Sequence, residues 1–286
     1  MKSHTDYMYT TAKEGVEEKR LAGLNVLHNP HTLKFLFPLL SGRKKILEVG
    51  CGSGNLAAEV LSVADEKTAY TGIDRDPAQV EHTKKLLKQF PNARVIQLDV
   101  VTEFEKLKNE GPFDLIYCRW LLVHLPSSIR REIIKNFLGL LSDVGVFLCD
   151  ECDNRSVRFK PIQLDSVVSA PYEEATKLWS TISKGLMQLL GNDLEYTPEK
   201  IEKDLLTASN GKGEVKIEGQ YQVVMRGKDQ KRLITDGYRS SSKVVSQVCS
   251  KPFEEIISLF DKCVEDESIE IEFLTENVAT YRIRRP

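Results

Sequence analysis

The sequence predicts an α/β fold built on a mostly parallel β-sheet. Between about residues 44 and 150, short apolar runs rich in β-branched residues alternate with longer amphipathic segments. Turn-forming residues separate these segments, and a cluster of glycines follows the first apolar run directly. An alternation of this kind is typical of repeated βαβ units, in which helices cover the faces of a parallel sheet.

The apolar runs define the predicted strands. Each has the length of a strand, and turn signals such as Gly111-Pro112 lie between them. The predicted strands cover residues 45–50, 69–74, 93–99, 113–119 and 145–151. The predicted helices between them cover residues 54–65, 77–90 and 127–141, and Pro77 falls where a first helical turn accepts proline.

The pattern changes after residue 151, where an inserted helical segment across 172–191 is expected to cover the sheet. It is indicated by an apolar helix face that carries Leu178, Ile182, Leu186 and Leu189. A strand near 214–224 and a helix near 252–265 follow, and two final runs joined by a turn at 275–277 end the chain. Terminal antiparallel strands are a common way to close a parallel sheet.

Four segments are predicted from these patterns. The first 40 residues hold two helical signals, "EGVEEKRLAGLNVL" and "PHTLKFLFPLL", and are too few for a core of their own. We expect them to pack over the sheet edge or the site. The segments are an N-terminal helical cap (1–43), a cofactor-binding core (44–152), a helical lid insertion (153–212) and the C-terminal part of the sheet (213–286).

Composition and charge exclude several classes of function. The 286 residues are 41% hydrophobic, and the formal net charge of -2 provides no basic field for nucleic acid. No apolar stretch approaches the roughly 20 residues that cross a bilayer, and the polar start lacks the apolar core of a signal peptide. We therefore expect a cytoplasmic protein with no membrane partner, whose six cysteines are buried thiols.

The segment "ILEVGCGSGN", residues 46–55, places three glycines directly behind the first predicted strand. Glycines in a strand-to-helix turn allow positive φ and let a ligand approach the main chain. A dinucleotide fingerprint needs G-x-G-x-x-G, but Asn55 stands in its last position here. Glu48 would repel a pyrophosphate and attract an ammonium, directly or through water. S-adenosylmethionine carries an ammonium and a sulfonium, and no phosphate.

The stretch "LEVGCGSG" resembles motif I of the class I S-adenosylmethionine-dependent methyltransferases. The resemblance implies a Rossmann-like, seven-stranded, mostly parallel sheet flanked by helices, with a terminal antiparallel strand and a helical lid insertion. It implies S-adenosylmethionine as the cofactor and S-adenosylhomocysteine as its product. The residues assigned to the cofactor are Glu48, Gly50, Cys51, Gly52 and Gly54 around the loop, Asp74 and Arg75 after the second strand, Asp99 and Val100 after the third, and Arg119 after the fourth.

The resemblance implies separate roles for two of these acids. Asp74 in "GIDRDP" ends the second predicted strand about 20 residues after the glycine loop, where a carboxylate can accept from both ribose hydroxyls. In the family that the chain resembles, Asp99 in "IQLDV" faces the adenine amino group and Val100 faces the ring. Taken singly, each acid has the alternative of a helix cap or a solvated turn.

The end of the fourth predicted strand, "YCRWLLVHLPSS", bears on the methyl acceptor. It lacks the motifs of amino-DNA, cytosine C5 and arginine methyltransferases, and it offers no acidic Mg²⁺ ligands, so no metal is expected. It resembles the small-molecule methyltransferases, including the ubiquinone and menaquinone biosynthesis group. His124 is predicted as a general base or acceptor-positioning group, with a core histidine as the alternative. Trp120 is predicted to line the acceptor site, with core packing as the alternative.

Three further residues are assigned through the same resemblance. The start "YMYTTAKEGVEEKRL" is similar to the segment that precedes the core in many small-molecule members. This implies that Tyr9 closes over the site and that Arg20 pairs with the methionine carboxylate. A solvated helix face is the alternative for Arg20. Trp179 in the inserted helical segment is a candidate for substrate contact, with core packing as the alternative.

The sequence thus predicts a methyltransferase that moves a methyl group to an O, N or C atom of a small molecule by in-line displacement. Three alternatives stay open: a non-catalytic S-adenosylmethionine-binding or interaction protein, a protein-directed methyltransferase, and a nicotinamide-dependent oxidoreductase. No nucleic-acid partner is expected. The oligomeric state stays open between a monomer and a homodimer.

Overall fold

The computed structural model describes residues 16–163, 170–191, 196–240 and 242–283. The chain divides into two compact units, each made of three segments. The first unit comprises Met1–Leu27, Cys152–Glu195 and Tyr221–Glu276. The second unit comprises His28–Glu151, Tyr196–Gln220 and Asn277–Pro286.

The strands of the described residues form one mixed sheet. They are β1 (Lys45–Val49), β2 (Ala69–Asp74), β3 (Ala93–Gln97), β4 (Phe113–Arg119), β5 (Leu141–Asp153), β6 (Arg158–Pro161), β7 (Gly213–Met225) and β8 (Ile269–Ile283). The order is β3-β2-β1-β4-β5-β8-β6, and β7 pairs with β8. The first five strands pair in parallel, whereas β6 and β8 are antiparallel. The predicted fold class is confirmed, and β6 is a strand that the sequence did not indicate.

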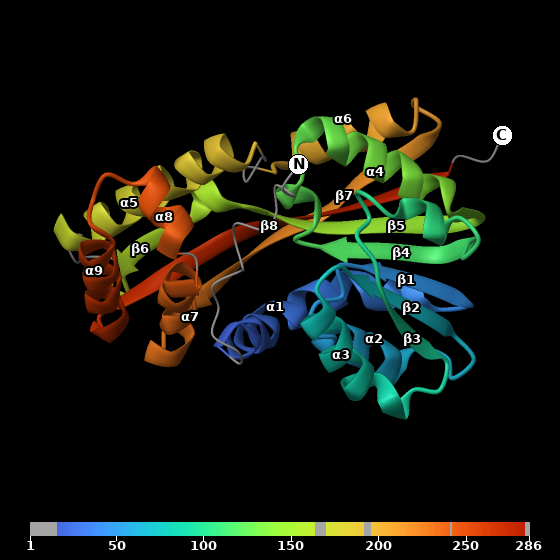
Figure 1. The fold of residues 1–286 in the computed structure, drawn as a ribbon, viewed down its shortest axis with the longest axis horizontal. Coiled ribbons are helices and arrows are strands. Elements are labelled where there is room, and N and C mark those ends of the chain that lie inside the picture. Colours follow the sequence, from blue (N-terminus) through green and yellow to red (C-terminus); the bar gives the residue numbers. More distant parts are fainter. Residues whose placement is uncertain (1–15, 164–169, 192–195, 241, 284–286) are drawn as a thin grey trace. The chain divides into compact units, whose positions relative to one another are not determined.

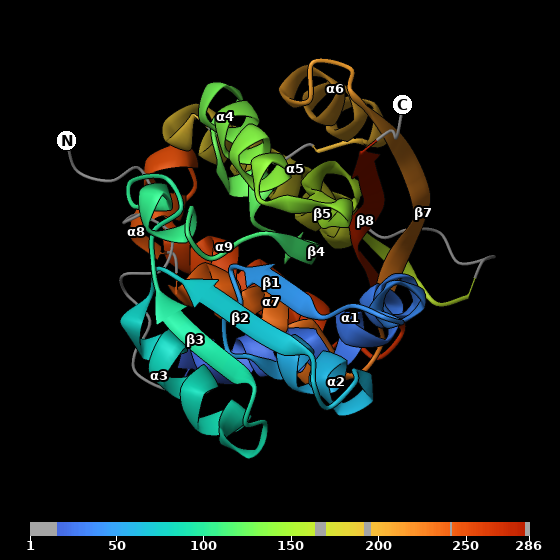
Figure 2. The ribbon, with the colours of Figure 1, turned by 90° about the vertical axis from the view of Figure 1, so that its right-hand side faces the viewer.

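Strand β1 has parallel neighbours on both sides (Figures 1 and 2). Ile46, Leu47 and Val49 are fully buried, as expected of a strand covered on both faces. In register, Val49 stands between Ile73 of β2 and Cys118 of β4. Because these strands are parallel, their carboxyl ends meet at one edge, where the loops that carry most predicted site residues begin.

The helices of the described residues are α1 (Val16–Leu40), α2 (Asn55–Val63), α3 (Pro77–Leu86), α4 (Ser127–Gly139), α5 (Ala170–Leu190), α6 (Pro198–Ala208), α7 (Lys228–Ser240), α8 (Ser242–Val248) and α9 (Phe253–Glu265). In the second unit, α2 and α3 lie on one face of the sheet, and α4 and α6 lie on the other (Figures 1 and 2). The predicted helices after β1, β2 and β4 are confirmed. At the start of α3, the Asp76 carboxylate accepts the Ala78 N–H at 2.8 Å, and Pro77 occupies the first turn.

The predicted turn at residues 275–277 is wrong, because β8 runs unbroken through it. Glu276 and Asn277 are buried within the strand. The Asn277 amide donates to the carbonyl oxygen of Tyr196 at 2.9 Å, and its Oδ1 accepts from the Gln220 amide at 2.6 Å. Asn277, a residue type that often marks a turn, is tolerated in this strand because its side-chain amide has hydrogen-bond partners.

Other predicted helices differ in detail. The two helical signals before β1 form one helix, α1, with Pro30 and Pro38 inside it. Of the apolar face predicted for α5, Leu178, Ile182 and Leu186 are buried, but Leu189 is 43% exposed. The helices α6, α7 and α8 were not predicted.

The first unit packs around aromatic rings. Tyr238 of α7 stacks on Phe260 of α9 with centroids 5.1 Å apart, and Phe260 stacks on Phe159 of β6 at 5.6 Å. The Trp179 ring of α5 meets Tyr238 edge-on at 5.1 Å. Stacked and edge-on pairs at these separations add to the stabilisation from burial, so the contacts tie α5, α7, α9 and β6 together.

A buried ion pair joins α4 to α6 in the second unit. The Arg130 Nε donates to Oδ2 of Asp204 at 2.6 Å, and the two side chains are 2% and 8% exposed. Arg130 also donates to the Leu125 carbonyl oxygen at 3.3 Å, and Tyr196 donates its hydroxyl to Asp204 at 3.1 Å. These additional bonds satisfy charges that would otherwise be costly to bury.

We expect Arg130→Met to destabilise the protein strongly, because it leaves the Asp204 carboxylate buried without its cation. The expected loss is about 3–5 kcal/mol in the free energy of unfolding, measured by urea denaturation. Arg131→Met, one residue along the same helix, is the control and should change stability by less than about 0.5 kcal/mol. Equal effects of the two changes would contradict this account of the ion pair.

Candidate functional site

The glycine loop joins β1 to α2, and its backbone is left-handed at three positions. Gly50, Gly52 and Gly54 have φ values of 74°, 50° and 76°, a region that favours glycine. The N–H groups of Gly50 and Cys51 donate to the Ile73 carbonyl oxygen at 2.8 and 3.0 Å. The loop that continues β1 is therefore anchored to the end of β2.

Two of these glycines differ in their surroundings. A Cβ at Gly54 would lie 2.6 Å from Cγ2 of Thr83, so glycine is needed for α3 to pack against the loop. Thr83 also donates its hydroxyl to the Gly52 carbonyl oxygen at 2.6 Å. A Cβ at Gly52 would meet no atom within 4 Å. The main chain at Gly52 thus borders open space, which fits a cofactor that approaches the backbone there.

Asp74 ends β2 and holds the glycine loop with its carboxylate. Its Oδ2 accepts the Gly52 N–H and its Oδ1 accepts the Asp76 N–H, both at 2.9 Å. Burial raises the pKa of Asp74, and these two N–H bonds oppose the shift. Each carboxylate oxygen has capacity to accept a further hydrogen bond, so the half-buried group suits a diol. Arg75, the next residue, is exposed.

Glu48 lies within β1 and is only 4% exposed. Its Oε2 accepts the hydroxyl of Tyr117 at 2.9 Å and also that of Tyr70. Burial raises the pKa of Glu48 to about 7, while the two tyrosine hydroxyls and the charge of Arg119 lower it. The role of Glu48 toward an ammonium stays a prediction. The two tyrosines that hold it were not indicated by the sequence, because their partner lies on another strand.

Asp99 follows β3 and forms a tight turn. Its Oδ1 accepts the Val101 N–H at 2.8 Å, and its own N–H donates to Oε2 of Glu103 at 3.1 Å. Val100 is 7% exposed. Asp99 therefore has the turn-capping contacts that the sequence left open as an alternative, and its contact with adenine stays a prediction.

Arg119 ends β4, and side chains of α1 fix its guanidinium. Its Nη1 donates to Oδ1 of Asn29 at 2.9 Å and to Oγ1 of Thr32 at 3.1 Å. Thr32 in turn donates to Oδ2 of the buried Asp150 at 2.6 Å. The Arg119 guanidinium carbon lies 5.4 Å from the Trp120 ring centroid, which is a cation–π separation. A positive charge is thus held at the edge of the sheet that carries the glycine loop.

Trp120 begins the turn after β4 with a φ of 54°, which is rare for a bulky residue. Its N–H donates to the Asp150 carbonyl oxygen at 3.0 Å. Its ring meets His28 of α1 edge-on, with centroids 4.7 Å apart. Burial, followed by the charge of Arg119, lowers the pKa of His28 well below its usual value. The acceptor-lining role of half-buried Trp120 stays a prediction.

Glu151 is a candidate site residue that the sequence analysis missed. It is fully buried beside Asp150 near the end of β5, and its carboxylate accepts N–H groups of the turn after Trp120. The signal was present in "FLCDECD", residues 147–153, which places adjacent acids in an apolar strand. Acids are rarely fully buried unless they are paired or hydrogen-bonded.

His124 lies half-buried at the end of the short 3₁₀ helix Leu122–His124. Burial lowers the pKa of His124 to about 4, and the charge of Arg75 contributes to the shift. The ring is therefore neutral at pH 7 and is a weaker base than an unperturbed histidine. Its catalytic role stays a prediction.

Three predicted site residues belong to the first unit by their position in the chain. Tyr9 lies outside the described residues. The Arg20 side chain packs against Gly237 of α7, where its Nη1 would lie 3.6 Å from a Cβ added to the glycine. The indole N–H of Trp179 donates to the Asn154 carbonyl oxygen at 3.0 Å, within the aromatic cluster of that unit. The cofactor and substrate roles of these three residues stay predictions.

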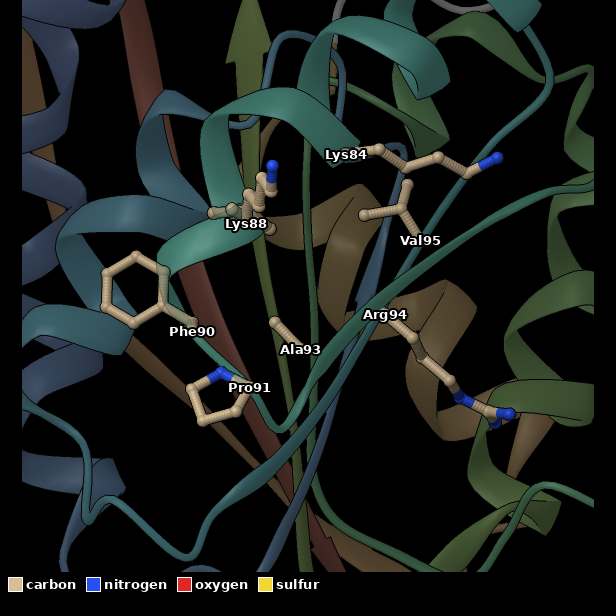
Figure 3. Close-up of a pocket in the computed structure, with 8 residues that line it drawn as sticks. Lys84, Lys88, Phe90, Pro91, Ala93, Arg94 and Val95 are labelled. Carbon is tan, nitrogen blue, oxygen red and sulfur yellow. The ribbon is translucent and has the colours of Figure 1, made fainter.

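A shallow depression of about 360 Å³ lies at the other edge of the parallel strands. Figure 3 shows it beside the end of α3 and the start of β3. Because β1 to β4 are parallel, the start of β3 is at the edge opposite the glycine loop. We therefore do not assign the depression to the cofactor. Its lining residues are Lys84, Leu87, Lys88, Phe90, Pro91, Ala93, Arg94 and Val95.

The cysteines are free thiols, and five of them are buried as predicted, whereas Cys249 is half-buried. Within the described part of the chain, no group of three or more His, Cys, Asp or Glu side chains is placed to hold a metal ion. Among residues 16–163, 170–191, 196–240 and 242–283, no helix has the length and apolar character needed to cross a membrane.

A glycine loop after the central strand, with an acid at the end of the next strand, defines the class of Rossmann-like domains that bind nucleotide-containing cofactors. The particular family follows from comparison with known proteins. The methyltransferase domain family matches residues 22–190 of the 286. The chain belongs to this family.

The relatives cover part of the chain. The ubiquinone biosynthesis O-methyltransferase of Vibrio campbellii is 28% identical over 121 residues, covering 41% of this chain and 48% of that protein. The enzyme of the same name from Histophilus somni is 31% identical over 125 residues, covering 41% and 50%. The chain therefore spans about half the length of these curated relatives. The YcgJ protein of Bacillus subtilis shares the fold, with a TM-score of 0.56, 13% identity, and coverage of 90% of this chain and 100% of that one.

We expect the free energy of unfolding of Glu48→Gln, relative to that of the wild type, to increase as the pH rises from about 5 to 8. The folded-state pKa of about 7 lies above the ordinary 4.5, so the folded protein binds more protons in this window and its stability falls as pH increases. The relative change is expected to approach about 3 kcal/mol. Urea denaturation of both proteins across this pH range measures it.

Tyr70→Phe is the companion variant, because its hydroxyl lowers the pKa of Glu48. Its removal should move the stability transition toward higher pH. Stability curves of wild type and Glu48→Gln that stay parallel from pH 5 to 8 would show that Glu48 does not titrate in this window.

Proposed function

We propose that the chain is an S-adenosylmethionine-dependent methyltransferase with a small-molecule acceptor. The observation that carries this proposal is the left-handed main chain at Gly52, which borders open space beside the Asp74 carboxylate. Membership in the methyltransferase domain family supports it. The two bacterial relatives are named as O-methyltransferases, which supports O-methylation as the reaction type.

The residues at the carboxyl edge fit a cofactor that has an adenosine part and an amino-acid part. The main chain of the glycine loop would lie against the amino-acid part, close to the carboxylate of Glu48. Asp74 would accept from the ribose hydroxyls with the acceptor capacity that its two N–H bonds leave. Asp99 and Val100 would contact the adenine ring. The predicted lid across 153–212 belongs to the same proposal.

When bound, S-adenosylmethionine supplies a methyl group on a positively charged sulfur, which the acceptor atom displaces in line. The protein aligns the acceptor, excludes water and takes up the proton that an oxygen acceptor loses. In our proposal, a neutral ring nitrogen of His124 accepts that proton. With a pKa of about 4, His124 is a weak base, so the acceptor hydroxyl should be a relatively acidic one. A phenol, with an ordinary pKa of about 10, meets this requirement better than an alcohol does.

The second candidate function is cofactor binding without turnover. The low pKa of His124 favours it, because burial of this kind is also expected of a core histidine. The two functions differ in whether S-adenosylhomocysteine accumulates when a phenolic acceptor is supplied.

We expect Asp74→Ala to weaken S-adenosylmethionine binding by tenfold or more, a loss of about 1.5 kcal/mol or greater, since hydrogen bonds to a charged group are lost. Isothermal titration calorimetry with S-adenosylmethionine, S-adenosylhomocysteine and NAD measures it. Asp65→Ala is the matched control, because Asp65 is exposed and precedes the other end of β2. Binding of NAD alone, or equal affinity of both variants, would overturn the cofactor assignment.

We expect His124→Ala to lower kcat by about 10²–10⁴-fold with little change in the Kd for S-adenosylmethionine, as for the loss of a general base. The assay follows S-adenosylhomocysteine formation with 3,4-dihydroxybenzoate as the phenolic probe. His82→Ala, an exposed histidine on α3, is the control. A kcat within twofold of wild type would assign His124 to the core.

A further inference from the structure

The turn that follows β4, residues 120–124, carries two of the side chains that are predicted to face the acceptor. Trp120 stands at its start and His124 at its end, and the 3₁₀ helix Leu122–His124 forms its second half. The positions of the two side chains therefore depend on the backbone of a single short turn. That backbone is strained, because Trp120 has a φ of 54° and such a conformation persists only where its surroundings enforce it.

Glu151 of β5 holds the backbone of this turn in its strained conformation. Its Oε1 accepts the N–H groups of Leu121 at 3.2 Å and Leu122 at 2.9 Å, and its Oε2 accepts the Val123 N–H at 3.0 Å. These are three consecutive backbone donors at the start of a helical turn, where N–H groups have no partner within the helix. One carboxylate therefore satisfies the whole amino-terminal side of the turn.

A neighbouring contact fixes the first residue of the same turn. The Trp120 N–H donates to the Asp150 carbonyl oxygen at 3.0 Å. Asp150 is also in register with Arg119 of β4. Four consecutive N–H groups, from residues 120 to 123, are thus held by two adjacent residues of β5. The turn is attached to the sheet along most of its length.

The burial of Glu151 carries a high desolvation free energy for a residue that only caps a turn. The residue is 0% exposed, and an ionised carboxylate in such a place is tolerated only when it is hydrogen-bonded. A neutral side chain can cap one or two N–H groups, but only an ionised carboxylate accepts with both oxygens and presents no donor toward them. The geometry therefore requires an acid.

We propose that Glu151 is a positioning residue for methyl transfer, whose ionised carboxylate holds the turn 120–124 in the one backbone conformation that presents Trp120 and His124 to the acceptor. The proposal rests on the proposed function for its catalytic consequence, whereas the control of the turn by Glu151 is independent of it. Protonation removes the charge and places a donor on one oxygen, so the N–H bonds to the carboxyl group are weakened. The turn relaxes as a result.

Burial raises the pKa of Glu151 to about 7, the charge of Asp150 contributes, and the three N–H bonds oppose the shift. Protonation of Glu151 therefore falls within an accessible pH range. Among the described residues, the titratable side chains that interact with it are Asp150 and Cys149 on β5, Cys118 on β4 at 3.7 Å, and Tyr196 before α6. Burial raises the pKa values of both cysteines and of Tyr196, so these three groups stay protonated where Glu151 titrates.

The test uses full-length protein labelled with 5-fluorotryptophan, which gives one ¹⁹F resonance for each of the two tryptophans. Trp120→Phe assigns them. We expect the Trp120 resonance to titrate with a midpoint near pH 7 and the Trp179 resonance to stay constant between pH 5.5 and 8.5. Glu151→Gln should abolish the titration of Trp120. Glu48→Gln, at the other acid with a pKa of about 7, should leave it in place.

Turnover provides the second measurement. Glu151→Gln should lower kcat by about tenfold or more, while the Kd for S-adenosylmethionine changes by less than about twofold. Glu270→Gln, a change of the same kind at a buried acid of the first unit, is the control for folding and activity. Circular dichroism verifies that each variant is folded.

The outcomes separate the two proposals. A Trp120 resonance that does not titrate, or that titrates equally in Glu151→Gln, overturns the positioning role. A kcat that Glu151→Gln leaves unchanged does so as well. Failure of wild type to bind S-adenosylmethionine overturns the proposed function instead, and the ¹⁹F titration then still decides whether Glu151 controls the turn.

Discussion

Buried carboxylates must be hydrogen-bonded, and the carboxyl edge of the sheet depends on how this requirement is met. The half-buried Asp74 accepts the N–H groups of Gly52 and Asp76, and the fully buried Glu151 accepts those of the turn after β4. In both cases the donors belong to loops that are candidates for ligand contact. Glu48 differs, because its donors are tyrosine hydroxyls inside the sheet. The hydrogen bonds that satisfy the carboxylates of Asp74 and Glu151 are therefore the same bonds that fix the shape of these loops.

Strands β1 to β5 supply the rigid frame on which these loops rest. Side chains of α1 add a polar network around Arg119, and Arg130, which pairs with Asp204, also donates to the carbonyl oxygen of Leu125 just after the turn 120–124. Polar contacts in the second unit thus restrain residues on both sides of this turn. Groups held in this way need little reorganisation when a ligand binds, which is the property expected of a site that works by alignment.

Local pattern allowed much of the fold to be predicted from the sequence. The parallel strands, the glycine loop and Asp74 follow from apolar runs, glycine spacing and position at a strand end. Contacts between distant segments could not be predicted from local pattern. The contacts of the tyrosines with Glu48, and of the α1 residues with Arg119, depend on strand order and register. The missed turn at 275–277 has the same origin, because Asn277 is accommodated in β8 by Gln220 and Tyr196. Glu151 was detectable as an acid in an apolar strand, but its function depends on a turn 30 residues away.

The packing of Thr83 against Gly54 has a consequence for sequence variation. A side chain at position 54 has no room while threonine occupies position 83, because even a Cβ would approach it within 2.6 Å. Thr83 is in turn held by the Gly52 carbonyl oxygen. A side chain at position 54 would therefore need a smaller residue at 83, and the φ of 76° at position 54 would favour glycine even then. Sequence variation in the glycine loop is in this way coupled to a helix that lies outside it.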